Sequence, residues 1–177
     1  MKFHSLPAGA LLLFAAGVAA QPLPRLAATT NDVTVSGISS GGYMAVQFQV
    51  AYSSVVRGAG IVAGGPYYCA EGSVRRALSN CMAPSGKDLP PTPDETLKTV
   101  RQLAEAGRID PLKHLQDDRV WLLAGGNDKT VLPPVMDALD AFYRATLPAE
   151  AINFVKVPDA GHAMLSVADP QANACPT

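Results

Sequence analysis

Residues 33–52 read VTVSGISSGGYMAVQFQVAY, and the predicted fold follows from this stretch. Its first three residues, Val-Thr-Val, are β-branched, which is typical of a short strand. Segment 37–41, Gly-Ile-Ser-Ser-Gly, follows at once and matches the pattern G-x-S-x-G. Apolar residues then recur at spacings of three and four, at Met44, Phe48, Ala51, Tyr52 and Val55. This period indicates a helix packed through that stripe, so the stretch predicts a strand, a sharp turn and a helix.

Ser39 lies at the centre of this turn. Between a strand and a helix, G-x-S-x-G is the pattern of a nucleophile elbow, in which the serine backbone is strained and nearby glycines avoid collisions. Gly37 and Gly41 lie two residues to either side of the serine. The geometry exposes Ser39 Oγ and sets the N–H of Ser40 at the helix start, where the helix dipole favours developing negative charge. The alternative is an ordinary turn rich in glycine and serine.

Beyond the turn, strand-like and helix-like segments alternate. Short apolar runs that end in turn residues predict strands at 58–63, 119–124 and 152–157. Helical spacing marks 92–106, capped by Thr92 or Asp94, and the segment after Pro134. Strands joined through helices form right-handed parallel crossovers, so the sequence predicts an α/β fold with a mostly parallel sheet.

Residues 67–93 interrupt this alternation with prolines and cysteines, which predicts an irregular excursion with one short helical piece at 73–79. A disulfide between Cys69 and Cys81 would close a short loop and stabilise the fold by about 3 kcal/mol in the chain-entropy account. Cys175 is then left over, with its partner in another chain or in further sequence. The cysteines have no companion at metal-ligand spacing, so no zinc site is predicted.

The first 20 residues have the features of a secretory signal peptide, with a basic start, an apolar run and small residues before Gln21. That run is too short to span a bilayer, and no later stretch approaches about 18 apolar residues. We therefore expect residues 21–177 to form one exported domain, extracellular or periplasmic. A formal net charge of −1 argues against nucleic acid as a partner.

Three residues that can carry acyl-transfer chemistry follow predicted strands: Ser39, Asp128 and His162. The carboxyl ends of parallel strands share one sheet edge, where α/β proteins bind ligands. A serine hydroxyl becomes nucleophilic when an imidazole accepts its proton, and a carboxylate on the other ring nitrogen fixes the tautomer. The sequence therefore predicts a catalytic triad in the chain order Ser, Asp, His.

Each member also has an alternative interpretation. Asp128 sits in a turn that it could simply cap, and Asp159 is a rival carboxylate three residues before His162. His162 could be a histidine of a surface loop. His114 is a second candidate base, although no predicted strand leads to it, and His4 falls in the predicted signal peptide.

Three segments resemble the polyhydroxybutyrate depolymerase-like esterases of the α/β-hydrolase superfamily: GISSGGYMAVQ with the following VAGGPYYC, then LLAGGNDKTVLPPVMDAL, then PDAGHAML. The resemblance implies an α/β-hydrolase-like sheet with helices on both faces. It also implies that Ser39 is the nucleophile, Asp128 the orienting acid and His162 the general base and acid. The implied reaction is hydrolysis of poly(3-hydroxybutyrate) or hydroxyalkanoate oligomers, with no metal or organic cofactor.

One departure from that pattern concerns the length of the chain. An ordinary α/β-hydrolase places several strands before its nucleophile. Here residues 21–38 precede the serine after the predicted cleavage site, and residues 163–177 follow the histidine. The family resembled is circularly permuted, with the remaining strands after the histidine. We therefore expect the sequence to be a partial form of a longer depolymerase, in agreement with the unpaired Cys175.

Two other functions stay open from the sequence. A triad does not select the acyl group, because specificity resides in loops such as 67–93, so an aryl or feruloyl esterase or a peptidase also fits. A truncated secreted protein that binds polyester without turning it over is the third interpretation.

Overall fold

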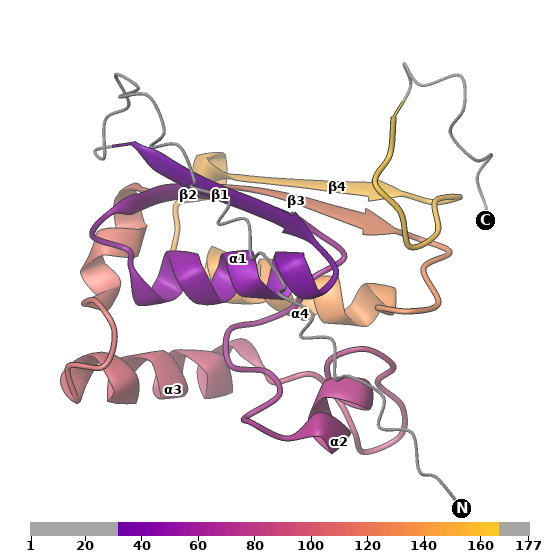
Figure 1. Ribbon diagram of the computed structural model, residues 1–177, viewed down its shortest axis with the longest axis horizontal. Helices are drawn as coiled ribbons and strands as arrows, with labels where there is room; N and C mark the ends of the chain where they lie inside the picture. The colour runs from indigo at the N-terminus through magenta and orange to yellow at the C-terminus, as the bar shows by residue number, and fades with distance from the viewer. Residues whose placement is uncertain (1–31, 167–177) are drawn as a thin grey trace, which may run out of the picture.

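The computed structural model describes residues 32–166 and shows a four-stranded parallel sheet packed on helices (Figure 1). The strands are β1 (Val33–Ile38), β2 (Val56–Val62), β3 (Arg119–Gly125) and β4 (Ile152–Val157), in that order across the sheet. Every predicted strand is present, and the last has the predicted bounds. The predicted signal peptide and Cys175 lie outside the described residues.

The main helices lie on one side of the sheet (Figure 1). They are α1 (Ser40–Ala51), α3 (Pro93–Glu105) and α4 (Pro133–Arg144). The connections also hold the short elements α2 (Val74–Leu78), η1 (Leu112–Asp117) and η2 (Ala149–Ala151). Each connection steps to the next strand in the same direction, and right-handed crossovers that do so place their helices on the same face. No helix within residues 32–166 is long and apolar enough to cross a membrane.

The opposite face of the sheet carries no helix within residues 32–166 (Figure 1). Strand register aligns Ser36, Gly60, Trp121 and Asn153 across that face, and Trp121 is 40% exposed. The predicted parallel α/β sheet is confirmed. The sequence predicts helices on both faces of the sheet, and within residues 32–166 they cover one face only. The reason is that each successive strand is added on the same side of the one before it, so every crossover helix falls on the same face.

Helix α1 packs through a different face from the predicted one. The stripe that contains Met44 and Phe48 is exposed, with Met44 62% accessible. The buried residues of the helix are Gly42, Ala45, Val46, Gln49 and Val50. These side chains are mostly small, so the helix can lie close to the sheet. Helix α1 has apolar residues on two sides, and the side with the larger ones is exposed. The size of the apolar residues therefore did not indicate the buried face.

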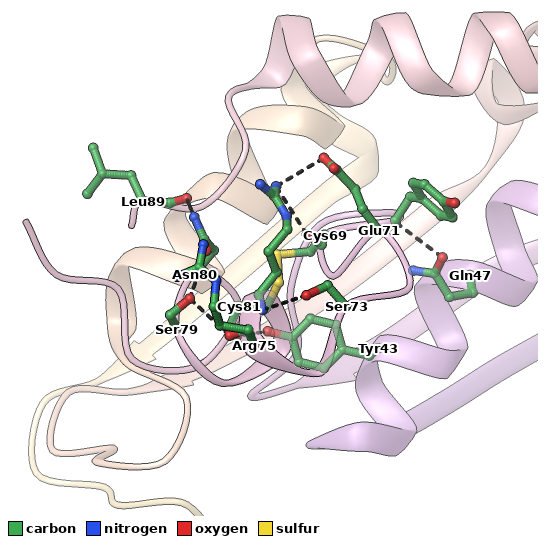
Figure 2. Close-up of a disulfide and its surroundings, with 12 residues drawn as sticks. Tyr43, Gln47, Cys69, Glu71, Ser73, Arg75, Ser79, Asn80, Cys81 and Leu89 are labelled. Atoms are coloured by element: carbon green, nitrogen blue, oxygen red, sulfur yellow. Dashed lines mark hydrogen bonds and ion pairs between the residues drawn. A yellow bond between two sulfur atoms is a disulfide. The ribbon is translucent and has the colours of Figure 1, made fainter. Parts of the chain in front are cut away.

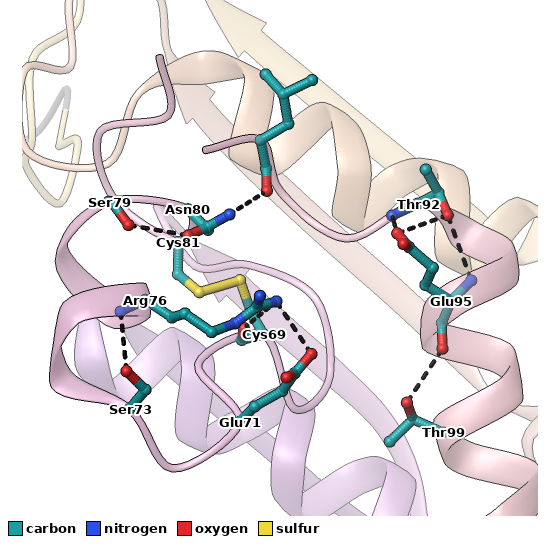
Figure 3. Close-up of polar contacts among 11 residues, drawn as sticks. Cys69, Glu71, Ser73, Arg76, Ser79, Asn80, Cys81, Thr92, Glu95 and Thr99 are labelled. Atoms are coloured by element: carbon teal, nitrogen blue, oxygen red, sulfur yellow. Dashed lines mark hydrogen bonds and ion pairs between the residues drawn. A yellow bond between two sulfur atoms is a disulfide. The ribbon is translucent and has the colours of Figure 1, made fainter. Parts of the chain in front are cut away.

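The other two long helices match their predictions. Thr92 caps α3 in a capping box: its hydroxyl accepts from the Glu95 N–H at 3.3 Å, and the Glu95 carboxylate accepts from the Thr92 N–H at 2.8 Å (Figure 3). The Thr92 N–H and hydroxyl both donate to the Glu95 carboxylate, and these two hydrogen bonds lower the pKa of Glu95. Helix α4 and the turn after it bury the predicted apolar residues, which are Val135, Leu139, Phe142, Tyr143 and Leu147.

A polar cluster, not foreseen from the sequence, is buried beneath the amino end of β3. The Gln49 amide donates to Asp118 Oδ2 at 3.1 Å, and the Tyr143 hydroxyl donates to Gln49 Oε1 at 2.7 Å. The second oxygen of Asp118 is buried and has no hydrogen-bond partner within residues 32–166. Burial raises the pKa of Asp118 to about 6, partly opposed by the hydrogen bond from Gln49.

This shift predicts that Asp118 contributes more to the stability of the fold in mild acid than at neutral pH. Because the folded pKa exceeds the unfolded value, the contribution of Asp118 is fully present below about pH 4 and is lost as the pH rises through about 6. Asp118→Asn should therefore stabilise the protein by up to about 3 kcal/mol at pH 8 and by little at pH 4. Urea unfolding across this pH range measures the difference.

Asp117→Asn is the matched control for this measurement, since Asp117 is exposed next to the same strand. The control should keep most of the pH dependence of the unchanged protein, because the charge of Asp117 makes only the smallest contribution to the raised pKa of Asp118. An Asp118→Asn variant that also does so would contradict the assignment.

Candidate active site

Ser39 forms a strained turn between β1 and α1. Its backbone has φ 57° and ψ −124°, a conformation that a residue with a side chain seldom adopts. Two hydrogen bonds hold it: the Ser39 N–H donates to the Val62 carbonyl at 2.9 Å, and the Tyr43 N–H donates to the Ser39 carbonyl at 3.0 Å. The predicted sharp turn is therefore present, with the serine at the carboxyl end of β1.

The glycines of the turn differ in what they do. A Cβ on Gly37 would lie 2.3 Å from the Gly41 carbonyl group, so no side chain fits there. A Cβ on Gly41 would meet nothing within 4 Å, which corrects the expectation that both glycines avoid a collision. Gly42 is the second tight position, because its Cβ would approach the Val62 carbonyl oxygen to 2.9 Å. The helix can then pack against the end of β2.

The start of α1 presents backbone N–H groups beside the serine. Ser40 is the first residue of the helix, and the Tyr43 N–H already bonds to Ser39. The amides between them precede the first intrahelical hydrogen bond, so they point out of the helix end, where its dipole is positive. Ser40 thus lies at the start of the helix, as the sequence predicts.

Asp128 and His162 are in direct contact at the same edge of the sheet. His162 Nδ1 lies 2.8 Å from Asp128 Oδ2. The other carboxylate oxygen accepts from the N–H groups of Thr130 at 2.8 Å and Val131 at 2.9 Å. The Asp128 side chain is 1% exposed and that of His162 is 22% exposed. The acid is thus fixed by its own loop and holds His162 Nδ1, whereas Nε2 has no hydrogen-bond partner within residues 32–166.

Two glycines at the carboxyl end of β3 let the acid and base loops approach each other. A Cβ on Gly125 would lie 2.4 Å from the Ala160 carbonyl oxygen, and one on Gly126 would lie 2.4 Å from that of Pro158. The Asn127 N–H donates to the Ala160 carbonyl at 2.9 Å. The sequence Gly125-Gly126 is therefore needed for the contact between Asp128 and His162.

The competing candidates lie elsewhere. Asp159 is exposed, and the imidazole is paired with Asp128 instead. His114 lies in η1, which precedes β3 and is therefore at the opposite, amino end of the sheet. Within residues 32–166, no hydrogen bond joins the Ser39 hydroxyl to His162, although both residues follow strand ends on the same edge. The same residues include no cluster of His, Cys, Asp or Glu suited to a metal ion.

A cavity of about 500 Å³ opens beside the serine. It reaches from Ser39 and Ser40 along α1 to the segment around Cys69 and Cys81, which are joined by the predicted disulfide. The sequence predicts only that substrate specificity resides in loops such as segment 67–93. The individual lining residues, such as Tyr43 and Val131, could not be identified because they come from separate elements.

The parallel sheet, the strained serine turn and the acid–base contact define a class: the described residues are part of an α/β-hydrolase fold. No family model matches the sequence. The chain is, however, homologous to poly(3-hydroxybutyrate) (PHB) depolymerases. It is 47% identical over 162 residues to poly(3-hydroxybutyrate) depolymerase of Delftia acidovorans, covering 90% of this chain and 31% of that protein. It is 40% identical over 130 residues to polyhydroxybutyrate depolymerase of Talaromyces funiculosus, covering 73% of this chain and 36% of the relative.

Solved structures agree with these relatives. The crystal structure of PHB depolymerase from Penicillium funiculosum matches with a TM-score of 0.70 and 31% identity, covering 82% of this chain and 44% of that one. A serine-to-alanine variant of a PHB depolymerase complexed with an R3HB trimer matches with a TM-score of 0.71 and 29% identity, covering 88% and 47%. The chain therefore spans about a third of the length of the curated relatives it matches, and less than half of these two structures.

The two glycines at either side of the serine provide a test of the turn. Gly37→Ala should destabilise the protein by about 2 kcal/mol or more, because the new methyl group overlaps with backbone. Gly41→Ala should be neutral or stabilising by up to about 1 kcal/mol, since it replaces glycine in a helix where space is open. Urea unfolding of both variants measures this, and equal losses would contradict the described turn.

Proposed function

We propose that this chain carries the catalytic machinery of a secreted serine esterase that hydrolyses poly(3-hydroxybutyrate) or its oligomers. The homology to PHB depolymerases supports the reaction class, and one related structure is described as a complex with an R3HB trimer. The observation that carries the proposal is the 2.8 Å contact between His162 and the buried Asp128, on the sheet edge where the Ser39 turn also ends. We further propose that residues 1–20 are a signal peptide and that residues 21–177 form part of the catalytic domain.

In the first step, Ser39 Oγ attacks the carbonyl carbon of the ester while His162 Nε2 accepts the hydroxyl proton. Asp128 holds the proton on Nδ1 and stabilises the imidazolium. The carbonyl electron pair moves onto oxygen, and the N–H of Ser40 at the positive end of α1 stabilises that charge. Collapse of the intermediate breaks the ester C–O bond, and His162 returns the proton to the leaving oxygen.

The second step repeats this chemistry with water. His162 takes a proton from water while the water oxygen attacks the acyl carbon, and the bond to Ser39 Oγ then breaks as His162 returns the proton to that oxygen. The products are a free carboxylic acid and the regenerated serine. The two steps consume one water molecule, and each proton that His162 takes is returned.

A serine-directed fluorophosphonate should label the protein, because it reacts with an activated hydroxyl. Ser39→Ala should abolish the labelling, as measured by mass spectrometry of the intact chain. Ser40→Ala is the matched control, since in the proposal this residue contributes only its backbone N–H, and its labelling should persist. Labelling that survives in Ser39→Ala would refute the nucleophile. An unlabelled wild-type chain that still binds polyester film would favour the non-catalytic alternative.

Asp128→Asn should lower kcat by roughly 10³- to 10⁴-fold, because the amide favours the wrong imidazole tautomer and cannot balance the imidazolium. The control is Asp159→Asn, which changes the other carboxylate close to His162 in sequence and should leave kcat unchanged. The kcat of both variants is measured from the acid released during hydrolysis of the R3HB trimer. If Asp159→Asn gives the larger loss, then the assignment of the orienting acid is wrong.

A further inference from the structure

We propose that the cavity beside Ser39 is the acyl-binding pocket of the esterase and accepts short, uncharged aliphatic acyl groups. Its outer wall is residues 67–83, which we call the disulfide loop. This inference rests on the proposed function and adds to it the side of the serine on which the acyl group binds, and the residues that set its size.

The disulfide loop encloses the cavity against helix α1. The bond between Cys69 and Cys81 closes the loop, with 6.0 Å between the two Cα atoms (Figure 2). Both cysteines line the cavity together with Ala77 from α2, Met82 and Val131. A volume of about 500 Å³ falls within the roughly 300–1,000 Å³ typical of small-molecule sites.

The placement of the imidazole decides which half of an ester enters this cavity. His162 and Asp128 are not among the lining residues, whereas Ser39 and Ser40 are. The base must return its proton to the leaving oxygen, so the alcohol half of the ester lies on the side of His162. The acyl half then points away from the imidazole, and the cavity is the space that receives it.

The lining selects against charge. Its only carboxylate is Glu71, which forms an ion pair with Arg76 at 3.0 Å (Figure 3). Tyr43 stays neutral, since burial and, to a smaller extent, the charge of Asp128 raise its pKa. Its hydroxyl donates to the Cys81 carbonyl. With no unpaired cation in the lining, a free carboxylate would be desolvated without compensation, whereas an aliphatic acyl group contacts mostly carbon and sulfur.

The position of the wall is set from the same helix that carries the serine. Tyr43 holds the Cys81 end of the disulfide loop, and Gln47 holds the other end by accepting from the Tyr68 N–H at 3.2 Å (Figure 2). A third connection runs to the loop that follows Asp128, where the Leu132 N–H donates to the Met82 carbonyl at 2.8 Å. Tyr43 and Gln47 are therefore positioning residues for the pocket.

Ala77→Phe tests the pocket by filling it. We expect the ratio of kcat/KM for p-nitrophenyl hexanoate to kcat/KM for p-nitrophenyl acetate to fall about tenfold or more, because the longer acyl chain needs the space. Ala83→Phe adds the same ring to an exposed residue of the same loop outside the lining, and this ratio should stay unchanged. An unchanged ratio in Ala77→Phe would overturn the proposal.

Gln47 tests the positioning role. Gln47→Leu removes the acceptor for Tyr68 and should raise KM for the hexanoate ester about three- to tenfold with kcat nearly kept. Gln47→Glu keeps an acceptor oxygen and should restore KM. A loss in kcat alone would show that the residue acts on the serine and not on the wall.

A binding measurement separates this inference from the esterase proposal. In protein labelled with ¹³C at methionine methyl groups, methyl (R)-3-hydroxybutyrate should shift the Met82 resonance, assigned with Met82→Leu. The shift should be lost in Ala77→Phe and kept in Ala83→Phe. If the wild type hydrolyses no ester but shows this pattern, then the pocket stands and the esterase function falls. If Met82 does not respond, then the pocket assignment falls.

Discussion

The structure depends on how closely the end of β1 can approach the start of α1. Ser39 occupies a strained backbone conformation that is held by hydrogen bonds to Val62 and Tyr43, and Gly37 and Gly42 leave just enough room for it. Because the turn is anchored to the end of β2, the hydroxyl and the first amides of α1 are fixed relative to the sheet. The strain is tolerated since the surrounding packing determines it from several sides.

The rest of the site follows from the parallel sheet. Strands that run in one direction bring the loops after β1, β3 and β4 to the same edge, so residues distant in the chain become neighbours. The loops after β3 and β4 meet closely because Gly125 and Gly126 have no side chains. On the other side of the serine, α1 supports the disulfide loop through Tyr43 and Gln47. One helix therefore orients both the nucleophile turn and the wall of the adjacent cavity.

Much of this arrangement could be predicted from local sequence. The buried strands are short apolar runs with clear ends, and α3 and α4 have one-sided apolar patterns. Helix α3 also has a recognisable cap and α4 begins with prolines, so their positions were correct. The pairing of Asp128 with His162 followed from strand ends and chemistry. The predicted buried face of helix α1 was wrong, because the helix has apolar residues on two sides and only tertiary packing decides which side is buried. The cluster of Gln49, Asp118 and Tyr143 joins three elements, so no local pattern reveals it.

The exposed indole on the open sheet face has a spectroscopic consequence. Trp121 is the single tryptophan of the sequence, and it alternates with Val120 and Leu122, which face the core shared with α1 and α4. Intrinsic tryptophan emission is therefore a signal from that face alone. A blue shift would report that polypeptide or polymer has come to rest over β2 and β3, independently of any event at the serine.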